Sequence, residues 1–225
     1  QYKKNAQYTL DLEEALEGAN FVINLVKIGF LEASEMDMDV AKKYGLFQTI
    51  GDTCGLAGIF RGLRTMVFVI KLCETIEKVS APGAIVLNYT NPQSMLVMAA
   101  AATSKVPFIG LCHSVQGTTR MIAKYMDIPY EELSYEAAGI NHMNWITKLV
   151  RNGEDIYPEF RRLVKERGIY NESETGDLVR AGLGPTRLDM LNRVGYMVTE
   201  SSTHFPEYVP YYLRTQKLRD KYKIE

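Results

Sequence analysis

The chain has 225 residues, of which 46% are hydrophobic and 24% are charged, a composition typical of a globular protein with a buried core. Its 26 basic and 27 acidic residues leave a net charge of −1, which argues against a basic nucleic-acid-binding protein or one held to anionic membranes by charge. No apolar run reaches the roughly 18 residues that span a bilayer, and three cysteines without CxxC spacing argue against a disulfide framework. We therefore expect a soluble, cytoplasmic protein with no nucleic-acid or membrane partner.

The first half of the chain alternates helix and strand patterns. Three apolar runs have the length and composition of strands, at residues 21–26, 84–87 and 108–111. The helical patterns that precede and separate them lie at residues 10–18, 59–79 and 94–103. The run at 21–26 is typical of a strand buried on both faces. This order predicts the α/β class, with a doubly wound parallel sheet and right-handed crossovers.

The pattern changes after about Val115. The later segments are a helix at 117–126, a segment around 135–150, a charged helix and loop within 154–175, and a short run at 195–198. We therefore predict a boundary near Ser114, between one domain at 1–114 and a second at 115–225.

A glycine-rich phosphate-binding turn is missing. A dinucleotide-binding fold usually presents GxGxxG directly after its first strand, whereas Gly51, Gly55 and Gly58 have the wrong spacing and follow no strand directly. Either the fold is not Rossmann-like or the first βαβ unit lies upstream of Gln1. Because the chain opens without Met and stops directly after a charged helical pattern, we expect a fragment.

Two apolar runs end in residues that can bind a metal. Cys112 and His113 follow a predicted strand, and Asn141 and His142 follow the apolar run at 137–140. The carboxyl ends of parallel strands are where α/β sheets place their chemistry, and a thiolate with an imidazole can hold a divalent metal. For either residue alone, a core thiol or a structural histidine is the alternative.

Five motifs, in order along the chain, resemble glycoside hydrolase family 4 and within it the α-galactosidase (melibiase) branch. They lie at residues 51–65, 88–92, 112–118, 138–143 and 200–208. The resemblance implies the remainder of an NAD-binding, Rossmann-like domain at 1–114, truncated before its glycine-rich loop. It also implies the start of a lactate/malate-dehydrogenase-like α+β substrate domain at 115–225.

The implied reaction is redox-assisted hydrolysis of a small α-galactoside. Bound NAD⁺ takes a hydride from C3, a base removes the acidified C2 proton, and the glycosidic oxygen leaves C1. Water then adds and the hydride returns. Mn²⁺, or another divalent metal, binds the 2- and 3-oxygens and stabilises the developing charge. The resemblance also implies a homodimer or homotetramer.

Matching positions carry over the family's roles. Cys112 and His142 become metal ligands, and two protein ligands leave room for substrate oxygens. His113 becomes the acid that protonates the leaving oxygen, with orientation of Cys112 or the metal as its alternative. Asn24 and Asn88 become cofactor-binding residues.

The sugar-binding and base positions are less sharply matched. The substrate-binding residues implied are Asn91, Asp52, Arg64 and Asn141. The C2 base falls in the window from Glu200 to Tyr208, which also contains Glu207, and we predict either His204 or Tyr208.

Three alternatives stay open at this point. The substrate could be an α-galacturonide or an α-glucoside. The protein could instead be an NAD-dependent 2-hydroxy-acid dehydrogenase, which would need no cysteine ligand. A catalytically inactive fragment or interaction module is the third alternative.

Overall fold

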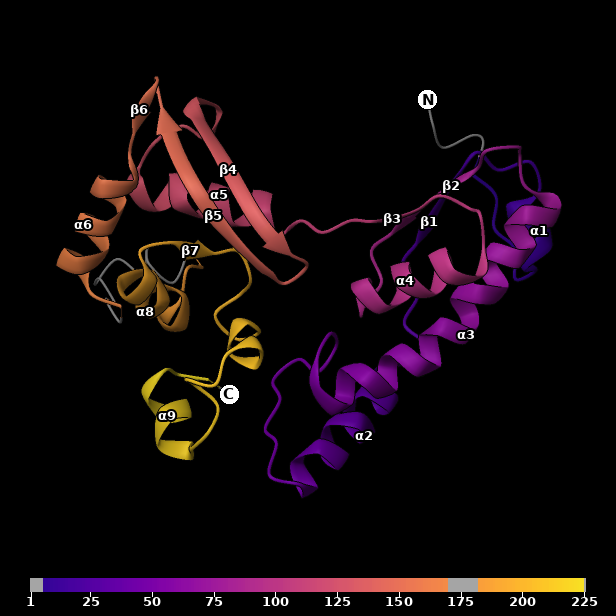
Figure 1. Ribbon diagram of the computed structural model, residues 1–225, viewed down its shortest axis with the longest axis horizontal. Coiled ribbons are helices and arrows are strands. Elements are labelled where there is room, and N and C mark those ends of the chain that lie inside the picture. The colour runs from indigo at the N-terminus through magenta and orange to yellow at the C-terminus, as the bar shows by residue number, and fades with distance from the viewer. Residues whose placement is uncertain (1–5, 170–181, 225) are drawn as a thin grey trace. The chain divides into compact units, whose positions relative to one another are not determined.

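The computed structural model describes residues 6–169 and 182–224 (Figure 1). The chain divides into two compact units. The first comprises Gln1–Val40 and Asp52–Leu111, and the second comprises Ala41–Gly51 and Cys112–Glu225. The domain boundary near Ser114 stays a prediction. None of the helices in the described ranges combines the length and apolarity needed to traverse a membrane.

The first unit contains a three-stranded parallel sheet, which confirms the predicted α/β class. Its strands are β1 (Phe21–Asn24), β2 (Ile85–Asn88) and β3 (Phe108–Gly110), in that spatial order. The accompanying helices are α1 (Leu12–Leu16), α2 (Phe30–Lys43), α3 (Gly55–Val79) and α4 (Gln93–Thr103).

Helix α3 packs its buried stripe against the sheet and the neighbouring helices. Leu72 and Ile76 lie in one core cluster with Val86 of β2 and Leu16 of α1. Val69 of α3 lies in another cluster with residues of α4. Each such buried side chain stabilises the fold by about 1.5–3 kcal/mol, so this stripe anchors the strands whose carboxyl ends carry the predicted site.

The prediction that β1 is buried on both faces is wrong. Phe21 and Ile23 are 69% and 61% exposed, whereas Asn24 is buried. Alternate residues of a strand point to opposite faces. In the described part of the chain the helices α1 and α3 cover the face opposite to Phe21 and Ile23, which leaves those two side chains exposed.

Helix α2 was not predicted. Its buried face carries Ala33, Asp37 and Ala41, four residues apart, while its large apolar residues Leu31 and Met36 are exposed. The buried residues are small or acidic and the large apolar residues are exposed, so the apolar pattern does not mark the buried face and the sequence predicts a polar stretch.

Helix α3 begins at Gly55, four residues before the predicted start at Ile59. A Cβ atom at Gly58 would lie 2.6 Å from the main-chain carbon of Thr53. Glycine is required for this close approach, and the same glycines lowered the apparent helix propensity.

The second unit contains an antiparallel sheet. Its strands are β4 (Leu133–Ile140), β5 (Met143–Arg151), β6 (Glu154–Asp155) and β7 (Met197–Val198), with β7 paired to β5. The helices are α5 (Ser114–Met126), η2 (Tyr130–Glu132), α6 (Tyr157–Arg167), α8 (Pro185–Val194), η3 (Phe205–Tyr208) and α9 (Gln216–Lys221). The segment predicted at 135–150 is the β4–β5 hairpin. The charged segment is α6 over part of its length, and residues 170–175 of it lie outside the described residues.

Tyr157 connects three elements of this unit. Its hydroxyl donates to the carbonyl oxygen of Ile146 at 2.7 Å and accepts from the backbone N–H of Met197 at 2.8 Å. Burial raises the pKa of Tyr157 to about 12. The phenol therefore stays neutral and ties α6 to β5 and β7.

Candidate functional site

Four of the predicted site residues meet in the second unit. Cys112 lies two residues before α5, and His142 lies in the turn between β4 and β5. His204 is the N-cap residue of η3, and Tyr208 is its last residue. These elements are far apart in sequence, so the cluster exists only in the folded chain.

Cys112 is the thiol of the site. Its sulfur lies 3.0 Å from the hydroxyl oxygen of Ser114. Burial alone would raise the thiol's pKa, but hydrogen bonding with the side chains of His142 and Ser114 and with the Ser114 backbone outweighs burial, and the pKa lies below its usual value. A stabilised thiolate is the form that binds metals and reacts with electrophiles.

His142 has an unusual backbone conformation. It is one of the two turn residues between Ile140 and Met143, and its φ of 60° lies in the left-handed region. Gly139 precedes the turn at φ 139°, where a Cβ atom would lie 2.4 Å from the carbonyl oxygen of Met143. Non-glycine residues in such conformations often occur at functional sites, and here the turn holds a buried imidazole at the end of the hairpin.

Glu200 lies at the centre of the cluster. Its Oε2 accepts a hydrogen bond from Ser114 Oγ at 3.0 Å and lies 3.6 Å from His142 Nε2. Its Oε1 lies 3.8 Å from His204 Nδ1. In the sequence, Glu200 was only the first residue of the range predicted to contain the C2 base. Its spacing of four residues from His204 is the sequence feature that could have predicted this contact.

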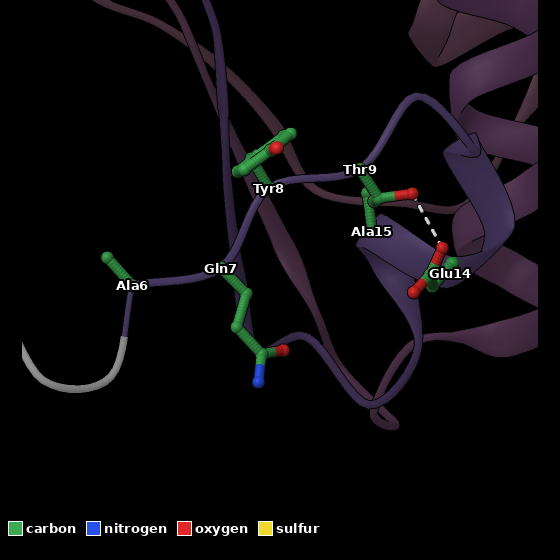
Figure 2. Close-up of a pocket in the computed structure, with 6 residues that line it drawn as sticks. All are labelled: Ala6, Gln7, Tyr8, Thr9, Glu14 and Ala15. Atoms are coloured by element: carbon green, nitrogen blue, oxygen red, sulfur yellow. Dashed lines mark hydrogen bonds between the residues drawn. The ribbon is translucent and has the colours of Figure 1, made fainter.

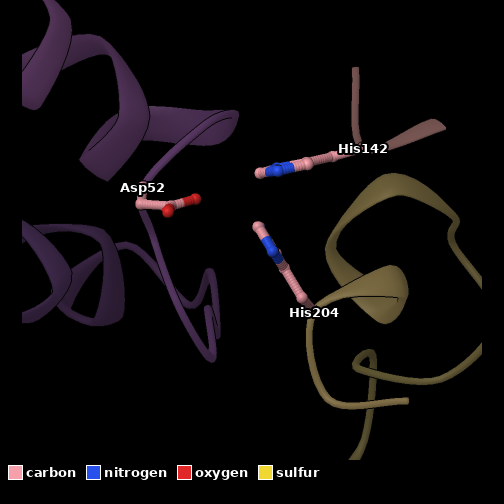
Figure 3. Close-up of side chains that lie close together, drawn as sticks. All are labelled: Asp52, His142 and His204. Atoms are coloured by element: carbon pink, nitrogen blue, oxygen red, sulfur yellow. The ribbon is translucent and has the colours of Figure 1, made fainter. Parts of the chain in front are cut away.

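The rings of His142 and His204 converge from two different elements, as Figure 3 shows, with their centroids 4.9 Å apart. The Tyr208 hydroxyl lies 3.3 Å from His142 Nδ1 and 3.2 Å from His204 Nε2. One phenolic oxygen therefore contacts both imidazoles, and a proton can pass between neighbouring groups of this set.

The donor chemistry of Cys112 and His142 fits a borderline-soft divalent metal. A thiol with a lowered pKa and an imidazole hydrogen-bonded to it supply one sulfur and one nitrogen ligand. Glu200 beside His142 is the kind of carboxylate that orients a ligating histidine.

The first unit brings together Asn24 and Asn88 at the carboxyl ends of β1 and β2. Asn24 Nδ2 donates to Asn88 Oδ1 at 2.7 Å, and Asn88 Nδ2 donates to Gln93 Oε1 at 2.7 Å. Asn24 Oδ1 is buried and has no hydrogen-bond partner among the described residues. This orphaned acceptor fits a donor from a bound molecule at the sheet edge.

Asn91 and Asp52 also meet, because Asn91 Nδ2 donates to Asp52 Oδ2 at 2.8 Å. Arg64 does not join them. Its guanidinium pairs with Asp37 of α2 at 2.5 Å and donates to the carbonyl oxygen of Ile28. Arg61 instead donates from its Nε to the carbonyl oxygen of Asn91 at 3.0 Å.

His113 and Asn141 flank the second-unit cluster. His113 is the exposed N-cap residue of α5, and the Oδ1 atom of Asn141 is buried without a hydrogen-bond partner among the described residues. A separate hollow in the first unit is lined by Ala6 to Thr9, Glu14 and Ala15, where Thr9 Oγ1 donates to Glu14 Oε2 at 2.6 Å (Figure 2). That hollow contains none of the predicted site residues.

Comparison with known proteins gives concordant matches over both parts of the chain. Residues 2–128 match the family 4 glycosyl hydrolases and residues 137–225 match the family 4 glycosyl hydrolase C-terminal domain. The α-galactosidase of Bacillus subtilis is 38% identical over 205 residues, which are 91% of this chain and 45% of that protein. The α-galacturonidase of Thermoanaerobacter italicus is 30% identical over 95% of this chain and 49% of that protein.

A solved structure of a relative agrees with these matches. The 6-phospho-β-glucosidase of Thermotoga maritima, crystallised with manganese, NAD⁺ and glucose 6-phosphate, has a TM-score of 0.70 and 25% identity. The match covers 96% of this chain and 47% of that one. The chain spans about half the length of the curated relatives it matches.

Proposed function

Because this chain belongs to glycosyl hydrolase family 4, we propose that it forms part of an NAD- and Mn²⁺-dependent glycosidase that hydrolyses α-galactosides. The observation that carries the proposal is the convergence of Cys112 and His142, next to Tyr208, in one cluster. A 2-hydroxy-acid dehydrogenase gives no reason for a cysteine with a lowered pKa beside a buried histidine.

The residues divide the chemical work between metal binding and proton transfer. When bound, NAD⁺ would supply a hydride acceptor and Mn²⁺ a Lewis acid beside the sugar's 2- and 3-oxygens. Cys112 and His142 would hold the metal. Tyr208 would take the C2 proton as a base, and the imidazole of His204, whose Nε2 lies 3.2 Å from the Tyr208 hydroxyl, would stabilise the deprotonated oxygen by donating a hydrogen bond to it.

The remaining predicted residues would bind and orient the ligands. Asn24 offers its unpaired Oδ1 at the end of β1 to the cofactor, with Asn88 holding the Asn24 side chain in place. Asn91 and Asp52, held together at 2.8 Å, would bind sugar hydroxyls, as would Asn141. His113, exposed at the start of α5, would protonate the leaving oxygen. Arg64 is less suited to sugar binding because its guanidinium is occupied by Asp37.

The choice of substrate rests on the higher identity to an α-galactosidase than to an α-galacturonidase. An α-galacturonide is the competing substrate. A cytoplasmic location and a homodimeric or homotetrameric assembly remain predictions that accompany this function.

The test is cleavage of p-nitrophenyl α-galactoside and of the corresponding α-galacturonide by the protein with and without NAD⁺, Mn²⁺ and a reductant. We expect cleavage of the galactoside only when all three are present. The Cys112→Ser variant should lose activity by at least about a hundredfold while remaining folded, with Cys54→Ser as the matched control. Robust cleavage after removal of both cofactors would contradict the redox route.

A further inference from the structure

Glu207 is a buried carboxylate to which sequence reasoning assigned no role. Its side chain is 1% exposed. Its Oε1 accepts hydrogen bonds from the backbone N–H groups of three successive residues, Thr49 at 2.6 Å, Ile50 at 2.7 Å and Gly51 at 3.0 Å. Three consecutive amides directed at one oxygen form an anion-binding nest, so this oxygen fixes the main chain of residues 49–51.

The second carboxylate oxygen faces the proposed proton-transfer groups. Glu207 Oε2 lies 3.3 Å from His204 Nε2, the same ring nitrogen that lies 3.2 Å from the Tyr208 hydroxyl. The other ring nitrogen of His204 lies 3.8 Å from Glu200 Oε1. The two carboxylates therefore bracket the imidazole, and a rotation of the ring would separate it from Tyr208.

We propose that Glu207 is a positioning residue, with one oxygen anchored by the backbone nest at 49–51 and the other orienting the His204 ring toward Tyr208. The anchoring explains why the carboxylate can hold a ring without moving itself, since an oxygen with three backbone donors has a fixed location. The catalytic consequence rests on the proposed function, in which Tyr208 removes the C2 proton and His204 assists Tyr208.

The Glu207→Gln variant distinguishes the roles of the two carboxylate oxygens. The nest requires an acceptor, so the amide oxygen occupies it and the amide NH₂ replaces Oε2 beside His204. The loop stays anchored, but the group facing the imidazole changes from an acceptor to a donor. Glu207→Ala removes both interactions. Glu159→Gln, an exposed glutamate on α6 of the same unit, is the matched control.

Two readouts do not depend on activity. Backbone amide exchange at residues 49–51 should accelerate more in Glu207→Ala, which removes the acceptor, than in Glu207→Gln, which keeps a weaker one. The chain has only three histidines, so selective ¹⁵N-histidine labelling yields ring-nitrogen signals from three imidazoles. Single His→Gln variants assign them. Glu207→Gln should shift the His204 resonances and leave those of the exposed His113 unchanged.

The third readout is the isotope effect of a substrate deuterated at C2, measured in the presence of both cofactors. If His204 orientation assists C2 deprotonation, Glu207→Gln should lower kcat by about 10–100-fold, with little change in KM, and should increase the C2 isotope effect. A purely structural role would leave the isotope effect unchanged.

Unchanged His204 resonances in Glu207→Gln, or unchanged amide exchange at 49–51 in Glu207→Ala, would overturn the positioning role. Shifted resonances with wild-type kcat and isotope effect would overturn its catalytic part. If the wild-type protein cleaves the substrate without cofactors, the proposed function fails, and the exchange and resonance measurements still decide whether Glu207 positions His204.

Discussion

Cys112 and Cys73 show how neighbouring groups decide the behaviour of a thiol. Burial raises the pKa of Cys73, which lies in the core between α3 and α4. Burial acts in the same direction on Cys112, but the hydrogen bonds from His142 and Ser114 reverse its effect. The same residue type therefore has a raised pKa in one position and a lowered pKa in the other.

This difference predicts the order of alkylation. A pKa below the usual value of about 8.5 gives a larger thiolate fraction near neutral pH, and a raised pKa gives a smaller one. At pH 7 we expect iodoacetamide to modify Cys112 at least about tenfold faster than Cys73, as measured by peptide mass spectrometry. His142→Phe should slow modification of Cys112 alone. Equal rates at the two cysteines would contradict the described hydrogen bonding.

At the scale of elements, the hydroxyl of Tyr157 links α6, β5 and β7 at one atom. Tyr157→Phe would leave a buried carbonyl of Ile146 and a buried N–H of Met197 without this partner. An unsatisfied buried group costs about 1–3 kcal/mol, so we expect the variant to lose about 2–4 kcal/mol of unfolding free energy in urea titrations.

Tyr196→Phe is the control for that experiment, because Tyr196 is 46% exposed and contacts Tyr157 by its ring. It should change the unfolding free energy by less than about 0.5 kcal/mol. A loss in Tyr196→Phe as large as that in Tyr157→Phe would contradict this account, because Tyr196→Phe keeps the ring and removes a hydroxyl that makes neither of the two hydrogen bonds.

The elements that sequence reasoning identified are those with a strong hydrophobic signal. The three strands and α4 were placed to within a few residues, because runs of apolar residues are a local property of the sequence. Helix α2 was missed because its buried face is Ala33, Asp37 and Ala41. The burial of β1 was predicted wrongly because burial depends on what covers a strand, which the strand's own residues do not encode.

Some residues of the candidate site could be predicted from the sequence, but most of their contacts could not. Cys112 and His142 were named from motifs, but the contacts of Glu200 and Glu207 are made between segments up to 158 residues apart. Arg64 was assigned to the sugar from its place in a motif, whereas its guanidinium pairs with Asp37 on the helix that was not predicted. Long-range polar pairing has no local signature, so these roles emerged only from the folded chain.

At the scale of the molecule, both units place their polar groups at the ends of elements. Asn24 and Asn88 end two parallel strands, whereas His142 occupies a hairpin turn and Tyr208 a short 3-10 helix. Residues at the ends of elements can direct their side chains toward a ligand, while the packed cores behind them stay rigid. This division separates the residues that stabilise each unit from those proposed to do chemistry.

Glu207 also gives the stability of the whole chain a pH dependence. Burial tends to raise the pKa of its carboxyl, but hydrogen bonds from His204 and from the backbone of Ile50 and Gly51 outweigh burial, and the pKa lies below its usual value. A depressed folded-state pKa stabilises the protein above the unfolded-state value of about 4.3, and this contribution is lost as the pH falls through the folded-state pKa.

The Glu207→Gln variant should therefore be less stable than the wild type at pH 7, by about 1–3 kcal/mol, because hydrogen bonds to a charged acceptor are stronger than those to a neutral one. The difference in stability should narrow as the pH falls below about 4.3, where the unfolded chain takes up a proton, and should close below the lower folded-state pKa, where the folded carboxyl is neutral as well. Urea unfolding of both proteins between pH 3 and 7, with Glu159→Gln as control, measures this difference directly. If the difference in unfolding free energy stays constant across this range, the negative charge of Glu207 is not what holds the loop at 49–51. A difference caused only by changed side-chain packing would not depend on protonation.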